Sequence, residues 1–250
     1  MNEFELDLVT RDGAMDCFTA HPDGDGPFPA VVIYMDVIGI RDELHNFARR
    51  LAGEGYFALL PDLFYRDGRV RLDPATGGIE RMFAIGRDLT IEMVMRDTEE
   101  ILAYLDRSPI VAGPTGCIGY RMSGQFVVAA AGRFPAHIRA TASLHGTGLV
   151  SERDDSPHKM AASIKGEVYL GFAEVDPYVE PNVVPDITEA LHGASVEYAI
   201  ETHPGTQHAY SFPSLPMYVE PAAEKDWAAM FAMFDRQLRQ TVKAQRGMEP

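Results

Sequence analysis

The feature that most constrains the fold of this chain is an uninterrupted run of six β-prone residues, from Ala30 to Met35. A half-exposed strand would alternate apolar and polar residues. The run therefore predicts a strand buried on both faces of a parallel sheet. Apolar residues recur at helical spacing just after it, from Asp42 to Ala52, and Gly53 and Gly55 supply a stop. A buried strand followed by an amphipathic helix is the unit from which α/β folds are built.

The same alternation continues along the chain. Strands from Phe4 to Val9 and from Met15 to Ala20 flank a turn at Arg11-Asp12-Gly13, which predicts an opening hairpin. Further strands are expected at Tyr56 to Leu60, Thr115 to Gly119, Ile138 to Leu144, Gly166 to Gly171 and Ser195 to Ile200, and helices at Asp88 to Leu105, Met122 to Ala131, Val184 to Leu191 and Ala222 to Leu238. This order predicts an α/β fold whose mostly parallel central sheet is flanked by helices on both faces. No repeat or low-complexity linker divides the chain, so one domain spanning residues 1–250 is expected.

A polar, Gly-rich excursion from Tyr65 to Gly86 is too long for an ordinary connection. It predicts either a lid or binding loop, or a short helix around Ile79 to Ile85. Three arginines in it, Arg66, Arg69 and Arg71, either contact an anionic substrate or form a solvated basic face.

The composition excludes several functional classes. A net charge of −15 disfavours binding to nucleic acid or anionic lipid, so a small-molecule partner is expected. The longest apolar stretch is far shorter than the roughly 20 residues of a membrane-spanning helix, and the N-terminus lacks a secretory signal. Two cysteines, Cys17 and Cys117, are too few for a disulfide framework and agree with a reducing, cytoplasmic location. The first strand-to-helix turn lacks the spacing of a dinucleotide-binding loop, so no cofactor is predicted.

The candidate catalytic residues follow predicted strands, where ligands bind in parallel sheets. In the segment Gly119 to Gly124, small residues stand two positions before and two and three positions after Arg121, which is the spacing of a nucleophile elbow between a strand and a helix. Asp176 and then His208 follow two later strands. The order of elbow, acid and histidine is that of the α/β-hydrolases, in which the carboxylate orients an imidazole that takes a proton from the nucleophile.

From about Phe4 to Leu238 the chain resembles the dienelactone hydrolase family. The resemblance is carried by Asp36-Val37-Ile38-Gly39, by Ala48 to Tyr56 leading to Pro61-Asp62-Leu63, by the elbow, and by Asp176-Pro177-Tyr178-Val179 and Gln207-His208-Ala209-Tyr210. It implies an α/β-hydrolase fold and hydrolysis of a small lactone or ester. It also implies a triad at position 121, Asp176 and His208, with Asp36 as a carboxylate that gates the nucleophile.

The chain departs from that family at the nucleophile. The family elbow has Cys where this chain has Arg121, a permanent cation that has no lone pair and cannot form an acyl intermediate. Ser123 and Ala209 stand where the family often has Gly. Ser123 is two residues from the elbow apex and Cys117 lies within the preceding strand, so neither is expected to replace the nucleophile.

Other residues are expected to complete the site. The backbone N–H groups of Val37 and Met122 form a plausible oxyanion hole. Asp36 either pairs with Arg121 or merely ends its strand, and His145 either lines the cleft or is an ordinary loop histidine.

A metal site is the weakest of the interpretations. The set of His203, His208 and Asp176 would suit zinc or non-haem iron by ligand type. The short loop between the two histidines fixes no ligand geometry, so no metal site is predicted.

Three functions remain open. The first, which the resemblance favours, is a lactone or ester hydrolase whose activity is compromised by Arg121. The second is an enzyme without a covalent step, in which His208 and Asp176 form a general base and Arg121 binds a carboxylate, enolate or oxyanion. The third is a catalytically inactive protein that binds a small carboxylate at the elbow, where helix N–H groups and Arg121 attract anions.

Overall fold

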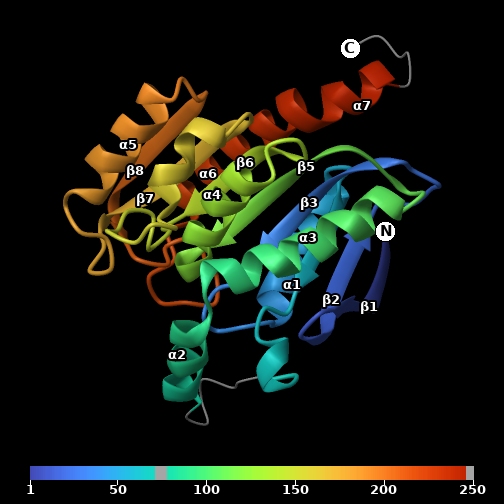
Figure 1. Ribbon diagram of the computed structural model, residues 1–250, viewed down its shortest axis with the longest axis horizontal. Coiled ribbons are helices and arrows are strands. Elements are labelled where there is room, and N and C mark those ends of the chain that lie inside the picture. Colours follow the sequence, from blue (N-terminus) through green and yellow to red (C-terminus); the bar gives the residue numbers. More distant parts are fainter. Residues whose placement is uncertain (71–77, 246–250) are drawn as a thin grey trace.

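The computed structural model describes residues 1–70 and 78–245, and its core is one eight-stranded sheet (Figure 1). The strands are β1 (Asn2–Thr10), β2 (Gly13–His21), β3 (Phe28–Tyr34), β4 (Phe57–Pro61), β5 (Val111–Tyr120), β6 (Ile138–Leu144), β7 (Glu167–Val175) and β8 (Tyr198–Gln207), in the spatial order β1-β2-β4-β3-β5-β6-β7-β8. β1 and β2 form the predicted hairpin, and β2 pairs antiparallel with β4. All other neighbours are parallel, which confirms the mostly parallel sheet.

Helices cover both faces of this sheet. They are α1 (Asp42–Gly53), α2 (Ile79–Asp88), α3 (Ile91–Arg107), α4 (Gly124–Arg133), α5 (Val183–Gly193), α6 (Glu220–Phe234) and α7 (Gln240–Gln245), with 3-10 turns η1 (Tyr65–Asp67), η3 (Arg121–Ser123) and η4 (Pro157–Ser163) and a π-helical turn η5 (Asp235–Arg239). Two adjacent residues of β5 show the two faces, because successive side chains of a strand point to opposite sides. A Cβ on Gly116 would meet Leu238 and Phe234, whereas the Cys117 thiol faces Val127 of α4.

The central strand β3 is buried on both faces, as its apolar run predicts. Val31 and Ile33 are fully buried in β3, and Val32 between them is only 2% exposed, so both faces of the strand are covered. On the face that carries α6, the Phe47 ring of α1 lies 5.6 Å from the Trp227 ring. Burial of such side chains contributes about 1.5–3 kcal/mol each and is the main source of stability for this core.

Several boundaries differ from the sequence-based expectation. β8 does not end near Ile200 but continues to Gln207, because β7 also continues and pairs with it as far as Val175↔Gln207. The segment between His203 and His208 was expected to be a loop, yet β8 runs through it, with a register shift in its pairing with β7. The last predicted helix is also interrupted, since α6 ends at Phe234 and passes through η5 into α7.

The excursion after β4 contains the predicted short helix, α2, which buries Met82 and Ile85. α2 ends at Asp88, and Thr90 then caps α3 by accepting a hydrogen bond from the Met93 N–H, so the helix expected to begin at Asp88 begins at Ile91. Figure 1 shows α2 standing apart from the sheet, beyond the end toward which β3 and β5 run. Arg71 lies outside the described residues.

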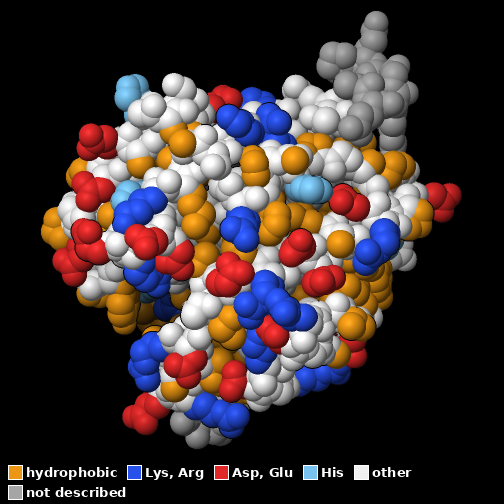
Figure 2. All heavy atoms as spheres, in the orientation of Figure 1, with side chains coloured by type: hydrophobic (Ala, Val, Ile, Leu, Met, Phe, Trp, Pro, Cys, Tyr) orange, Lys and Arg blue, Asp and Glu red, His pale blue; other side chains and the backbone are white. Residues whose placement is uncertain are grey.

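The described part of the chain contains no helix that is both long and apolar enough to cross a membrane. On the face drawn in Figure 2, Lys and Arg side chains are interspersed with Asp and Glu.

Candidate active site

The elbow follows β5 directly and has the strained geometry that its spacing predicts. Arg121 has φ 53°, in the left-handed region that only a few non-glycine residues adopt. A Cβ on Gly119 would lie 2.3 Å from the Ser123 carbonyl oxygen, and one on Gly124 would lie 2.4 Å from the Gly146 Cα. Only glycine fits at either position, because strand, turn and helix backbones touch there.

Arg121 points to a buried carboxylate. Its Nη1 donates to Asp36 Oδ2 at 3.0 Å, and Asp36 is fully buried. Arg41 Nη1 donates to the other carboxylate oxygen at 2.6 Å, and Arg41 also pairs with Glu43. Two arginines and two carboxylates thus form one ion-paired cluster, in which each buried charge has an opposite charge beside it.

The acid and the histidine meet, although 32 residues separate them. Asp176 directly follows β7 and His208 directly follows β8, and these strands are neighbours in the sheet. His208 Nδ1 lies 2.7 Å from Asp176 Oδ2, while Asp176 Oδ1 accepts the N–H of Tyr178. The Tyr178 ring lies 4.7 Å from the imidazole. Because Nδ1 is occupied, Nε2 is the ring nitrogen that a ligand can reach.

One cavity of about 290 Å³ brings Arg121 and His208 together. Its lining consists of Val37, Phe83, Gly86, Arg87, Arg121, Met122, Thr147, Tyr178 and His208. α2 forms one wall and approaches closely, since a Cβ on Gly86 would lie 2.9 Å from a Val37 methyl group. The cavity is mostly apolar with two arginines, so it suits a small apolar molecule that carries an anionic or polarised oxygen.

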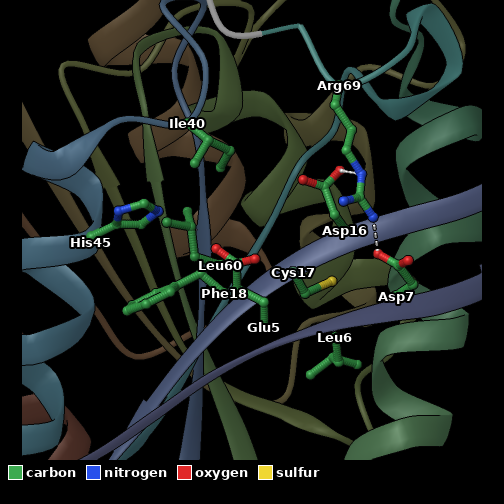
Figure 3. A pocket seen from close by; sticks show the side chains of 10 residues that line it. All are labelled: Glu5, Leu6, Asp7, Asp16, Cys17, Phe18, Ile40, His45, Leu60 and Arg69. Carbon is green, nitrogen blue, oxygen red and sulfur yellow. Dashed lines mark hydrogen bonds and ion pairs between the residues drawn. The ribbon is translucent and has the colours of Figure 1, made fainter.

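Of the arginines in the excursion, the two that the structure describes, Arg66 and Arg69, do not line the cavity at the elbow. Arg66 pairs with Asp12 and Asp97. Arg69 pairs with Asp7 and borders a different cavity of about 230 Å³ beside β1 and β2 (Figure 3). Carboxylates of the hairpin and of α3 are thus the partners that the two guanidinium groups bind.

His145 lies behind the cavity and does not line it. It is fully buried at φ 38°, its Nε2 lies 2.7 Å from Ser211 Oγ, and its ring is 5.5 Å from that of His208. The expectation that it lines the cleft is wrong because the ring packs among Tyr120, Tyr210 and Phe212. Burial, and then the nearby charges of His208 and Arg121, hold the pKa of His145 well below its usual range.

This depressed pKa predicts a loss of stability in acid. Between the native pKa of His145 and the unfolded value of about 6.5, only the unfolded chain binds the proton. The free energy of unfolding should therefore fall as pH drops below about 6.5, by up to ~1.4 kcal/mol per pH unit from this residue. Urea unfolding at several pH values measures the slope, and His145→Asn, which tolerates positive φ, should flatten it. Equal slopes in both proteins would contradict the assignment.

Neither of the other nucleophile candidates faces the cavity. The Ser123 hydroxyl donates to the Met35 carbonyl and ties the elbow to the end of β3. The Cys117 thiol lies 3.5 Å from Thr141 Oγ1, and burial raises the pKa of this thiol to about 12. A buried, protonated thiol is unreactive.

The three residues considered as metal ligands, His203, His208 and Asp176, do not form one group. His203 Nε2 lies 2.6 Å from Asp226 and is buried away from the pair of His208 and Asp176. No cluster of three or more His, Cys, Asp or Glu among the described residues is arranged to hold a metal ion.

Sequence reasoning missed several residues of the site. Arg41 follows Asp36 by five residues and precedes α1, but no local pattern says that its side chain turns back to that carboxylate. Phe83 and Arg87 come from α2, whose position over the elbow depends on tertiary packing. Tyr178 could have been found, because it stands two residues after the acid.

The chain is similar to known proteins over most of its length. A model of the dienelactone hydrolase family matches residues 15–238. A Synechocystis sp. relative, provisionally named carboxymethylenebutenolidase, is 25% identical and covers 89% of this chain and 92% of its own. A Bradyrhizobium relative, provisionally named a 2-oxo-3-(5-oxofuran-2-ylidene)propanoate lactonase, is 24% identical over 89% of each chain.

A solved structure from Klebsiella pneumoniae, described provisionally as a dienelactone hydrolase, has a TM-score of 0.83 at 23% identity and covers 93% of this chain and 98% of its own. A dienelactone hydrolase-like promiscuous phosphotriesterase from metagenomic libraries has a TM-score of 0.76 at 24% identity, with 95% and 98% covered. These likenesses show that the chain shares the fold of the two structures. With its α/β-hydrolase fold and a family match that runs from β2 into η5, the chain belongs to the dienelactone hydrolase family.

Proposed function

We propose that this protein hydrolyses a small lactone or ester without a covalent intermediate, with His208 as general base on a water molecule. The observation that carries the proposal is the 2.7 Å contact between His208 Nδ1 and Asp176 Oδ2 beside the cavity that also contains Arg121. A base and its orienting acid are thus retained although the nucleophile is lost. Hydrolase relatives, one of them named a lactonase, support the reaction class.

The proposed reaction proceeds through one tetrahedral intermediate. His208 Nε2 takes a proton from water as the water oxygen attacks the substrate carbonyl, and Asp176 stabilises the imidazolium through Nδ1. The backbone N–H groups of Val37 and Met122 stabilise the oxyanion. The C–O bond to the leaving group then breaks, and the proton on Nε2 passes to the departing alkoxide. A lactone becomes an open-chain hydroxy acid in this way.

Arg121 acts in this scheme as an anion binder. Its Nη1 is engaged by Asp36, but its buried Nε has no hydrogen-bond partner in the described structure. A guanidinium with unused donors favours a carboxylate or a developing oxyanion. Arg87 adds a second cation, while Val37, Phe83 and Met122 offer apolar surface to the body of the substrate.

The alternative of an inactive carboxylate-binding protein rests on the same unused donor. Tight binding of small carboxylates by calorimetry, together with no turnover of any ester or lactone, would favour it over hydrolysis. The buried free thiols of Cys17 and Cys117 suit a reducing compartment, so we place the proposed activity in the cytoplasm.

The proposal predicts opposite kinetics for the protein and its Arg121→Cys variant. With para-nitrophenyl acetate or an enol-lactone, the protein should turn over without a burst and show no acylated mass. The variant has a thiol beside His208 and should show a burst and gain one acyl group, because the thiolate attacks directly. Arg121→Ala is the control that removes the cation without adding a nucleophile. An acyl adduct on the unaltered protein, or no turnover of either substrate, would overturn the proposal.

A further inference from the structure

A second, fully buried cluster lies behind the His208 segment. Asp226 of α6 is fully buried and accepts hydrogen bonds from Tyr169 at 2.7 Å and from Tyr210 at 2.6 Å, with His203 Nε2 at 2.6 Å. Burial raises the pKa of Tyr169 and of Tyr210, so both hydroxyls keep the protons that they donate. A Cβ on Gly171 would lie 2.9 Å from both Asp226 Oδ1 and the Tyr210 oxygen, so glycine there leaves room for the cluster.

The cluster joins the elements that carry the proposed base and its acid. Tyr169 belongs to β7, which ends just before Asp176, and His203 belongs to β8, which ends just before His208. Tyr210 stands two residues beyond His208. Asp226 therefore ties β7 and β8 to each other and to the segment that follows β8.

The backbone between His208 and Tyr210 needs such an anchor. Ala209 has φ 73°, in the left-handed region that is strained for a non-glycine residue. The turn is closed by the Tyr210 N–H, which donates to the Gln207 carbonyl at 3.1 Å, and the Tyr210 carbonyl accepts the Val219 N–H at 2.9 Å. A strained turn persists only when its surroundings hold it, and the side chain of Tyr210 is held at Asp226.

We propose that Tyr210, bound to Asp226, is a positioning residue for His208 and holds its imidazole at hydrogen-bond distance from Asp176. The inference deepens the proposed function, because it assigns the support of the general base. A displacement of about 1 Å in a reacting group can cost ~100-fold in rate, so loss of the anchor should act on turnover through geometry.

Tyr210→Phe and Tyr169→Phe are a matched pair that tests this role. Each removes one hydroxyl that donates to Asp226 and keeps a buried ring, but only Tyr210 stands in the His208 turn. Both should lower Tm. Only Tyr210→Phe should broaden or shift the Nδ1–H signal of His208 in the NMR spectrum, assigned with His208→Gln, and lower kcat by about 10- to 100-fold with KM little changed.

The outcomes separate this inference from the proposed function, because the NMR signal needs no turnover. If the protein hydrolyses nothing but only Tyr210→Phe alters the signal, the positioning role stands and the proposed function fails. If both variants leave the signal and kcat unchanged, or alter them equally, the positioning role is overturned. Should Tyr210→Phe not fold, Asp226→Asn weakens the same anchor, and an unaltered His208 signal in that variant overturns the role.

Discussion

His208→Ala is expected to lower kcat/KM for an ester or lactone by a factor of ~100 to ~10,000, the usual contribution of a general base. The reason is that His208 Nε2 is the basic atom at the cavity that an orienting carboxylate supports, through the Nδ1 contact with Asp176. Asp176→Asn should lose less, because it disturbs the imidazole without removing it. Steady-state kinetics on the three purified proteins measures both effects.

The matched control is His192→Ala, which removes an exposed histidine at the end of α5, away from the cavity. It should keep full activity. Circular dichroism must show the same fold for every variant. Full turnover by a folded His208→Ala protein would exclude His208 as the base and leave the binding alternative stronger.

Gly119→Ala is expected to destabilise the protein by about 3 kcal/mol, at the upper end of what overpacking costs. The added Cβ would lie 2.3 Å from the Ser123 carbonyl oxygen and 2.9 Å from a Val127 methyl group. The first of these is a backbone atom of the elbow and cannot rotate away, so the turn that carries Arg121 must move. Urea unfolding measures the change in the free energy of unfolding.

Gly53→Ala is the control for the same chemical change at a site with space. No heavy atom lies within 4 Å of the Cβ position at Gly53, the last residue of α1. There alanine should stabilise by up to about 1 kcal/mol, because it restricts the unfolded chain and favours the helix. A similar loss of stability in both variants would show that crowding at the elbow is not the cause.

Local pattern was sufficient for much of the fold. The apolar run at β3 predicted a strand buried on both faces, and the spacing around Gly13 predicted the hairpin. The local sequence pattern was insufficient where pairing between strands extended an element beyond its predicted end. The segment between His203 and His208 was expected to be a loop, yet most of it lies within β8 because the extended β7 offers a partner.

The candidate site was likewise predictable from the sequence only in part. Chain order alone named Arg121, Asp176 and His208, because elbow, acid and histidine each follow a strand and the carboxyl ends of parallel strands share one edge of the sheet. Chain order could not show that Arg41 shares Asp36 with Arg121, or that His145 is buried. Those facts depend on side-chain direction, which residue spacing does not encode.

The sequence by itself determined the fold class, which follows from periodicity, and the family resemblance, which follows from its motifs. It also showed that an arginine stands at the apex of the elbow. The tertiary structure alone decided which charges neutralise each other, which helix covers the elbow and what supports His208. Asp226 illustrates the difference, because its partners come from 57, 23 and 16 residues away and meet only when β7, β8 and α6 pack together. Long-range contacts of this kind exist only in the folded chain.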